Sequence, residues 1–595
     1  MNELLIIWAK RAMVNIRAAG VLIFSFLIFS AGIWTLPLHE PDEGRYVDIA
    51  AAMSRPGGDW LTPRLNGIPY YEKPPLFFWI AAASMKVFGV VEWAGRLPAL
   101  LAALSAVALV IVMGKSAFGP RTGRAAGLIM ATSPLVMVLA HFCFVDVLLL
   151  ALLTGALAAL FYALIDRAPG QSSRRLPVLA FWALLALATM TKGPIGVAIP
   201  VITAGCYLLV ARDKHGLRGL VRLDAIALYF VIASPWFIMM ALKNPGFARA
   251  FFIEENLERF VTGGNFQRQG PWWYYFPVLA GTFFPWALAL GLVAKKVFRQ
   301  GLRVGEQPSR ARLFFVAAVV GPFLLLSFAQ SKLGYYILPL FPPLALLTAD
   351  AFASSGRADD STERNNAREF CRVCVMAAVL AGALGLAFLG VVFLPKDKIF
   401  ALVFDNQPYI EETRRMVLQA LLALQPLLSA GCFVIAVGAL AAYYVSSRRT
   451  AGVGITTLAC VLGMVAVCLP FAAARAEAAF SERPLARAAL PVLKPDDLVV
   501  LYTVYYRTVP FYLDRQVVLW NASYTEFGHR VPAAEASGRA LQENIDSLRA
   551  LLADQRRVVL IVKDERCLRE LQTFSTVPLY EVARLGSRRI VATRP

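Results

Sequence analysis

Charged side chains are scarce in this chain of 595 residues. They make up 16% of the sequence, whereas hydrophobic residues make up 58%, and the mean hydropathy is +0.60. A soluble globular protein carries about a quarter of its residues as charges. The composition therefore excludes such a protein and indicates a polytopic membrane protein.

Metal-binding residue types are few as well. The four histidines form no cluster in the sequence, and Cys371 and Cys374 make one Cys-x-x-Cys motif without a second pair or a nearby histidine. A zinc site needs four such ligands at suitable spacing, so none is expected. The eight cysteines lie mostly within apolar runs and indicate no disulfide framework.

The net charge of +20 does not indicate a nucleic-acid partner. Lysine and arginine occur in short clusters between apolar runs, which is the pattern of cytoplasmic loops in membrane proteins. We therefore expect no nucleic acid among the partners. Membrane lipids, including anionic ones, are expected instead.

The basic clusters also set the topology. Lys10, Arg11 and Arg17 place the N-terminus in the cytoplasm, and the long run 18–38 is expected to be an uncleaved first helix. The segment 76–91 either spans the membrane or lies on its outer surface. Only the second alternative puts every later basic cluster inside, so 76–91 is predicted to be an interfacial helix.

This count gives about thirteen spanning helices and an extracytoplasmic C-terminus. They centre on runs 18–38, 97–114, 125–141, 147–165, 177–191, 194–211, 225–242, 276–294, 313–329, 335–350, 373–394, 417–443 and 453–473. Residues 1–474 are thus predicted to form a membrane domain, with an outer loop and juxtamembrane helices at 39–96.

Residues 475–595 have a different pattern. Short β-prone runs occur at 497–502, 516–520, 558–562, 578–583 and 588–592, with a charged helical stretch near 533–554. This alternation predicts a small α/β domain on the outer side. It contains no glycine-rich phosphate loop.

Charged and aromatic residues return in five places on the predicted outer side. They lie in the loop 39–75, at His141 and Asp146, at Lys192, in the segment 243–275, and in 331–336. A charge beside hydrocarbon is costly unless it is solvated or paired, so this convergence indicates a reaction site.

Two carboxylates are the candidate catalytic groups. Asp42 could simply cap a surface helix, but its charged neighbours favour a function, and Asp146 lies in an apolar run where an unpaired carboxylate is expensive. Four outer-side cations are candidate phosphate contacts, although each alone would pass for a snorkelling anchor. They are Lys73, Lys192, Arg259 and Lys332.

Several motifs in chain order resemble the lipid A aminoarabinose transferases, members of the polyprenyl-phosphate-dependent GT-C glycosyltransferases that include protein O-mannosyltransferases. These motifs are Asp-Glu-Gly-Arg-Tyr (42–46), Gly-Asp-Trp-Leu-Thr-Pro-Arg (58–64), Tyr-Tyr-Glu-Lys-Pro-Pro (70–75), Val-Asp (145–146), Thr-Lys-Gly (191–193), Phe-Phe-Ile-Glu-Glu-Asn-Leu-Glu-Arg-Phe (251–260), Pro-Trp-Trp-Tyr-Tyr (271–275) and Ser-Lys-Leu-x-x-Tyr-Ile-Leu-Pro (331–339). The likeness runs from about residue 40 to 345, and the C-terminal third matches only in layout.

The resemblance implies an α-helical GT-C fold with thirteen transmembrane helices and a periplasmic C-terminal domain. It also implies a bacterial inner-membrane enzyme that faces the periplasm, an undecaprenyl-phosphate sugar donor, inverting transfer, and lipid A as the acceptor. Asp42 and Asp146 would line the reaction centre, and Lys73, Arg259 and Tyr336 would hold the donor phosphate. The other predicted substrate-site residues are Glu43, Tyr46, Tyr71, Glu72, Lys192 and Lys332.

Two departures from the family pattern stand out. Asn256 occupies a position where the resemblance leads us to expect histidine, and a partner histidine near residue 265 is missing. No cofactor is expected to be required, and the histidine pattern does not support a divalent metal. Tyr335 replaces a small residue, so both aminoarabinose and a related sugar stay open as the transferred group.

Three alternatives stay open on the sequence. A protein O-mannosyltransferase-like or polysaccharide-modifying transferase would use a hydroxyl acceptor, for which Asp42 or Asp146 would have to accept a proton. A polyprenyl-lipid transporter would turn nothing over, but the chain has no visible internal repeat of the transporter kind. A pure scaffold has no need for buried outer-side carboxylates.

Overall fold

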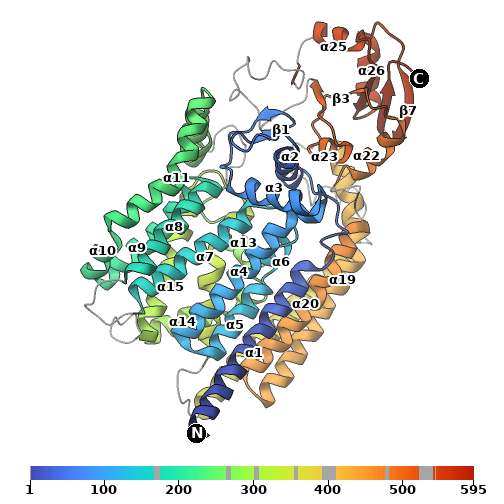
Figure 1. The fold of residues 1–595 in the computed structure, drawn as a ribbon. Coiled ribbons are helices and arrows are strands. Elements are labelled where there is room, and N and C mark those ends of the chain that lie inside the picture. The colour runs from blue at the N-terminus through green and yellow to red at the C-terminus, as the bar shows by residue number, and fades with distance from the viewer. Residues whose placement is uncertain are drawn as a thin grey trace.

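The computed structural model describes residues 2–166, 174–262, 270–300, 307–353, 360–391, 411–475, 477, 481–520, 541–542 and 545–595. Long apolar helices form a bundle, short helices and a hairpin lie across one end of it, and a mixed sheet lies beyond them (Figure 1). The N-terminus is at the opposite end of the bundle from the sheet (Figure 1).

Nine helices in the described part of the chain are long and apolar enough to cross a membrane, or ten if a pair bent by 112° is one span. The nine are α4 (Glu92–Phe118), α7 (Val145–Leu164), α8 (Arg175–Lys192), α11 (Leu223–Lys243), α15 (Gln307–Phe328), η4 with α16 (Gly334–Leu340 and Phe341–Phe352), α17 (Asp360–Gly390), α19 (Glu411–Arg448) and α20 (Ala451–Arg475). The bent pair is α13 (Tyr275–Thr282) with η3 (Trp286–Ala289) and α14 (Leu290–Gln300). The chain is thus a multi-pass membrane protein.

The predicted number of thirteen spans stays a prediction. Three predicted runs contain shorter helices: the apolar part of α1 (Asn2–Ser30), the pair α5 (Pro120–Ala131) and α6 (Pro134–Leu139), and α9 (Ile195–Ala211). The break between α5 and α6 has a local cause, since the residue before a proline avoids the helical region. Ser133, before Pro134, is extended, with φ −71° and ψ 125°.

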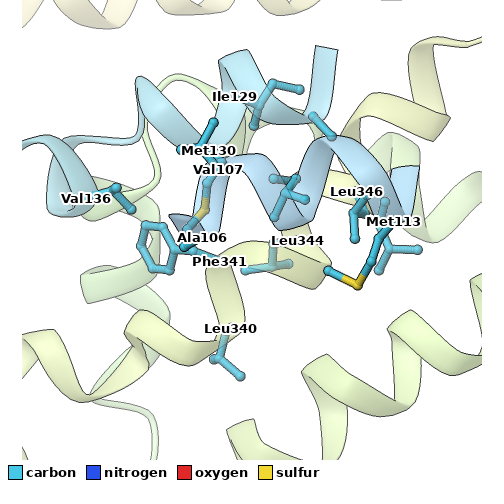
Figure 2. Close-up of a cluster of buried hydrophobic side chains, with 14 of the residues drawn as sticks. Ala106, Val107, Met113, Ile129, Met130, Val136, Leu340, Phe341, Leu344 and Leu346 are labelled. Atoms are coloured by element: carbon cyan, nitrogen blue, oxygen red, sulfur yellow. The ribbon is translucent and has the colours of Figure 1, made fainter. Parts of the chain in front are cut away.

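The bundle core lies where these helices meet. Figure 2 shows buried side chains from α4, α5, α6, η4 and α16 that point toward one another. A Cβ on Gly114 would lie 2.8 Å from the Cα of Gly123, so α4 and α5 approach closely at these two glycines. Small residues at such crossings are typical of membrane helix packing.

The interfacial elements lie across the end of this bundle (Figure 1). They are α2 (Asp42–Ser54), the hairpin β1 (Arg64–Leu65) and β2 (Ile68–Pro69), and α3 (Leu76–Phe88). The 13 residues of α3 extend about 20 Å, which is shorter than a hydrocarbon core of about 30 Å. This length agrees with the predicted surface helix at 76–91.

The C-terminal sheet has six strands in the order β5-β4-β3-β6-β8-β7. Their bounds are β3 (Leu498–Tyr502), β4 (Val518–Trp520), β5 (Leu541–Gln542), β6 (Val558–Val562), β7 (Tyr580–Leu585) and β8 (Arg588–Ala592). β3, β4, β5 and β6 pair in parallel, and β8 is antiparallel to both β6 and β7. All five β-prone runs are strands in the structure.

Alternation along the strands gives the sheet two apolar faces. One face packs with α25 (Ile545–Leu552) and α26 (Glu565–Phe574), and the other joins α22 (Arg483–Ala489) and α23 (Val509–Leu513). The hydrophobic cluster on this second face also contains buried residues of α2 and α3. The sheet and the interfacial loop therefore share one core. In the predicted helical stretch 533–554, α25 forms the helix from Ile545 to Leu552, and residues 533–540 and 543–544 lie outside the described part of the chain.

Candidate active site

A buried ion pair fixes the start of α2. Glu43 and Arg96 are fully buried and bridge at 2.7 Å, and Arg96 also donates to the carbonyl oxygens of Ile33, Leu36 and Pro37. The Glu43 carboxylate also accepts from the backbone amides at positions 39 and 143. With these partners the buried Glu43 side chain holds the loop in place, and its predicted role at the substrate stays a prediction.

Asp42 lies one residue earlier and has a different partner. Arg45, one turn along α2, bridges Asp42 at 3.1 Å and Glu72 at 3.2 Å. The Tyr70 hydroxyl donates to the same Glu72 oxygen at 3.1 Å. The carboxylate of Asp42 therefore lies at the start of a helix, with the Arg45 cation beside it.

Lys73 and Arg259 share one carboxylate. Lys73 Nζ lies 2.9 Å from Glu255 Oε1, and Arg259 bridges the same oxygen from one turn along the helix. Arg259 Nη2 also donates to the Tyr336 hydroxyl at 2.9 Å. Burial acts most strongly on the pKa of Arg259 and lowers it, but the charge of Glu255 together with smaller contributions from Tyr336, Glu72 and Tyr335 raises it above its ordinary value, so Arg259 stays charged. The three predicted phosphate ligands thus come together.

This cluster joins distant parts of the sequence. Lys73 precedes α3, Glu255 lies in the π-helix η1 (Arg249–Glu258), and Arg259 begins the short helix α12 (Arg259–Val261). A π-helix often marks a functional position. Tyr336 comes from η4.

Asp146 and Lys192, which the sequence predicts separately as site residues, pair with each other in the structure. Asp146 is in the first turn of α7, Lys192 is the last residue of α8, and the two side chains form a salt bridge. Gly193 ends α8 with φ +74°, a conformation that favours glycine. Lys192 Nζ also lies 4.5 Å from the centre of the Tyr336 ring, which brings this pair next to the first cluster.

A cavity of about 510 Å³ lies beneath these charges. Its polar lining residues are Glu72, Lys73, Asp146, Lys192, Glu255, Asn256, Arg259, Ser331 and Tyr336. Its apolar walls come from α7, α9, η1 and α15, with Leu149, Ile195, Ile199, Phe252 and Leu325 among them. The space is a largely apolar pocket whose lining also includes cations and carboxylates.

An aromatic wall connects Asp42 with Asp146. The Tyr46 ring contacts Phe144 at 6.0 Å, and Phe144 contacts Tyr335 at 5.2 Å between ring centres. Burial raises the pKa of Tyr46 well above its ordinary value, with smaller contributions from Asp42 and Asp146 among others. Both carboxylates therefore lie within electrostatic reach of one buried tyrosine.

Five predicted residues are not among those that line the cavity: Asp42, Glu43, Tyr46, Tyr71 and Lys332. Tyr71 packs in an apolar cluster, with its ring centre 5.6 Å from that of Phe247. Lys332 donates to the carbonyl oxygen of Ala329. The structure thus gives Tyr71 and Lys332 packing or backbone contacts, and their predicted substrate roles stay predictions.

The side chain of Asn256 does not fit the role of a metal ligand that the family pattern would give to this position. Its amide donates to the Phe251 carbonyl at 2.7 Å. Across the residues that the structure describes, no three His, Cys, Asp or Glu side chains are grouped as metal ligands. Residues 263–269, which include the second expected histidine position, lie outside the described part.

The sequence analysis missed two charged partners, Arg45 and Glu255. With them the site holds four cations and four carboxylates, which salt bridges connect to one another. They are Arg45, Lys73, Lys192 and Arg259, and Asp42, Glu72, Asp146 and Glu255. Such a site can bind an anionic leaving group between preorganised cations and stabilise developing positive charge beside carboxylates.

Residues of the C-terminal domain form hydrogen bonds with the loop that precedes Asp42. Glu40 accepts from the backbone amide and hydroxyl of Thr508 at 2.6 and 2.7 Å, and Leu38 N donates to the Tyr512 hydroxyl at 2.7 Å. A Cβ on Gly44 would lie 2.6 Å from Thr508 Cγ2, so α2 and α23 are in close contact. The position of Asp42 thus depends on this interface.

The helical bundle, the charged interfacial loop at one end and the sheet domain beyond it make up a GT-C fold. Comparison with solved structures supports this fold over nearly the whole chain. The crystal structure of ArnT from Cupriavidus metallidurans bound to undecaprenyl phosphate superposes with a TM-score of 0.81, at 26% identity, and 98% of each chain is covered. The apo state of the same protein gives a TM-score of 0.79 at 25% identity, again over 98% of each chain.

Sequence comparisons agree with the structure. A profile of the family described as dolichyl-phosphate-mannose-protein mannosyltransferase matches residues 72–239. Undecaprenyl phosphate-alpha-4-amino-4-deoxy-L-arabinose arabinosyl transferases are similar to the chain. The Pseudomonas paraeruginosa protein is 32% identical over 57% of this chain and 61% of its own length, and the Aeromonas salmonicida protein is 33% identical over 62% and 65%.

The chain therefore spans about three fifths of the length of these curated relatives in sequence. The resemblance to aminoarabinose transferases and the predicted GT-C fold are confirmed by these comparisons.

Proposed function

We propose that this protein is an inverting glycosyltransferase. It moves a sugar, aminoarabinose or a related one, from undecaprenyl phosphate to a phosphate of lipid A. The observation that carries this proposal is the cavity beneath Lys73 and Arg259. Its apolar walls suit a polyprenyl chain, and two cations with the Tyr336 hydroxyl suit the phosphate at the head of that chain.

In the proposed reaction, the bond between the sugar's anomeric carbon and the donor phosphate oxygen breaks. Charge then builds up on the leaving phosphate, and Lys73 and Arg259 stabilise it. The sugar becomes oxocarbenium-like, which the carboxylates of Asp42 and Asp146 favour. The acceptor oxygen bonds to the opposite face of the sugar, and undecaprenyl phosphate leaves.

The proton balance depends on the acceptor. A lipid A phosphate is already an anion and needs no base. A serine, threonine or sugar hydroxyl would lose a proton to Asp42 or Asp146. The names of the similar arabinosyl transferases support an undecaprenyl-phosphate aminoarabinose donor. The match of residues 72–239 to a protein mannosyltransferase family supports a hydroxyl acceptor as an alternative.

The location follows from the same proposal. The α2 and α3 end of the bundle is opposite the end that carries α14 and the N-terminus (Figure 1). Basic clusters such as Lys295 with Lys296 lie on that opposite end, which supports a cytoplasmic orientation there. The active site then faces the periplasm from the bacterial inner membrane. Residues 1–474 act as the catalytic domain, and 475–595 act as a periplasmic domain that steadies α2.

Mass spectrometry of lipid A from cells with and without the gene tests this function. A sugar mass on lipid A that appears only with the gene would support the proposal and identify the sugar. Unchanged lipid A, together with loss of glycoprotein staining in the deletion strain, would refute the lipid A acceptor and favour the mannosyltransferase-like alternative.

A further inference from the structure

A second cavity lies at the far end of the bundle from the candidate active site. It has a volume of about 1,020 Å³ and lies between α14, α17 and α19. Its lining includes four arginines, Arg364, Arg368, Arg372 and Arg449, and a single carboxylate, Glu369. Nothing in the proposed transfer reaction uses this cavity.

The arginines form an ordered cationic surface. Arg364, Arg368 and Arg372 recur every four residues on α17, so they lie along one face of the helix. Arg449 directly follows α19, which ends at Arg448 and lies far away in the sequence. Loop arginines that merely set topology need not converge on one cavity from two helices.

The carboxylate does not neutralise this surface. Glu369 is shared by Lys295 at 3.2 Å and Arg372 at 3.0 Å. The lining therefore keeps an excess of positive charge among its described residues. An anion with more than one phosphate oxygen suits such an arginine cluster.

The other half of the cavity is apolar. Val375 and Met376 continue the α17 face one turn beyond Arg372, and they are 42% and 44% exposed. Leu288 and Leu292 line the opposite side. Gly291 leaves open space, because a Cβ built there meets no atom within 4 Å. From Arg364 to Met376 the surface changes from cationic to apolar over about 18 Å of helix.

We propose that this cavity binds an anionic phospholipid of the membrane leaflet opposite the active site. The phosphate lies against the arginines, and an acyl chain lies over Gly291, Val375 and Met376. The change from cationic to apolar along α17 follows the change from headgroup to chain in a phospholipid. A free anion would leave the apolar half uncovered, and a zwitterionic lipid would bring an ammonium group to the arginines. Basic pockets between membrane helices bind anionic headgroups in this way.

Native mass spectrometry of the delipidated full-length protein tests the site. Cardiolipin, phosphatidylglycerol and phosphatidylethanolamine are titrated against the wild type and three variants. Arg368→Gln/Arg449→Gln removes two charges from the lining. Arg218→Gln/Arg448→Gln is the matched control, because both residues are exposed arginines outside the lining. Gly291→Leu fills the apolar half without changing charge, and leucine suits a helix better than glycine.

We expect the two anionic lipids to bind at least about tenfold more tightly than phosphatidylethanolamine. Arg368→Gln/Arg449→Gln and Gly291→Leu should each weaken cardiolipin binding about tenfold, while the control double variant stays near wild type. Equal losses in both arginine pairs would overturn the proposal in favour of general surface charge. Full competition by inorganic phosphate, or undiminished lipid binding by Gly291→Leu, would overturn it in favour of a soluble anion. If Arg368→Gln/Arg449→Gln does not fold, Gly291→Leu decides.

Discussion

The carboxylate of Glu255 occupies the position between the two cations that the donor phosphate is proposed to use. Its Oε1 atom is the common partner of Lys73 and Arg259. We predict that Glu255→Gln tightens the binding of undecaprenyl phosphate. The amide keeps the shape of the side chain but removes the negative charge that competes with the phosphate for the same two cations.

The structure sets the size of this effect. Lys73, Arg259 and Glu255 side chains are only 12%, 13% and 4% exposed, so water screens the charges weakly. A unit charge about 6 Å from the phosphate contributes about 3 kcal/mol at an effective dielectric constant of ~20. Allowing for residual screening, we expect a gain of about 1–3 kcal/mol, or roughly 5- to 150-fold in Kd.

Tighter product binding should slow turnover, because undecaprenyl phosphate must leave after each transfer. We expect a lower kcat together with the lower Kd, measured by titration calorimetry and by steady-state transfer. Glu254→Gln is the matched control: Glu254 is the neighbouring residue, pairs with Arg249 at 3.3 Å, and does not line the cavity. An unchanged or weaker Kd in Glu255→Gln would refute the competition and leave Glu255 as a residue that only orients the cations.

Four further predictions concern the catalytic carboxylate, the buried supports of α2 and the pH dependence of stability. Asp146→Asn should lower transfer about 100-fold or more without lowering the unfolding temperature, since it acts on the transition state; near-normal kcat would contradict its role. Arg96→Gln should cost about 3–5 kcal/mol of stability in thermal unfolding, because it leaves the buried Glu43 charge unpaired; a wild-type melting curve would contradict this. Gly44→Ala should lower kcat by pushing α2 away from α23. Adding Thr508→Ser, which removes the contacting methyl group, should restore part of the kcat. No recovery in the double variant would show that this contact does not matter. Burial raises the pKa of Asp48 to about 6, above its unfolded value, so its contribution to stability should fall as pH rises through about 6, and Asp48→Asn should abolish this slope in pH-dependent unfolding.

The sequence was enough to predict the fold class and the strands. The C-terminal strands are short runs of β-branched residues, as in Val558–Val562, and the structure has a strand at each predicted run. The helix α26 was missed because its charged, amphipathic sequence resembles a surface loop. Asp564 caps it by accepting from Cys567 N at 2.8 Å, and an aspartate before a charged helical stretch is a signal that could have located its start.

The pairing of charges was harder to predict. Arg96 lies 53 positions from Glu43, and Glu255 lies 182 positions from Lys73, so only the packing of the helices brings the partners together. The sequence indicated that charges beside the membrane need partners, but it did not say which acid pairs with which base. The sequence therefore predicts a substrate role for Glu43, whereas in the structure its carboxylate forms a salt bridge with the buried Arg96.

Local breaks in the helices made the number of spans hard to predict from the sequence. Pro134 separates two short helices within the run 125–141, and α13 and α14 are bent by 112°. Hydropathy averages over such breaks because it counts apolar residues without regard to backbone direction. The positive-inside rule leaves 76–91 out of the count of spans, and the 13 residues of α3 are fewer than the about 20 that a spanning helix needs.

Transfer by the purified protein tests the central claim most directly. The full-length chain in detergent would receive a synthetic undecaprenyl-phosphate sugar and lipid A, and the products would be separated and weighed by mass spectrometry. We predict one glycosylated lipid A for each undecaprenyl phosphate released, and no product with Asp42→Asn or Asp146→Asn. Release of undecaprenyl phosphate without glycosylated lipid A, or equal product from both variants, would contradict it.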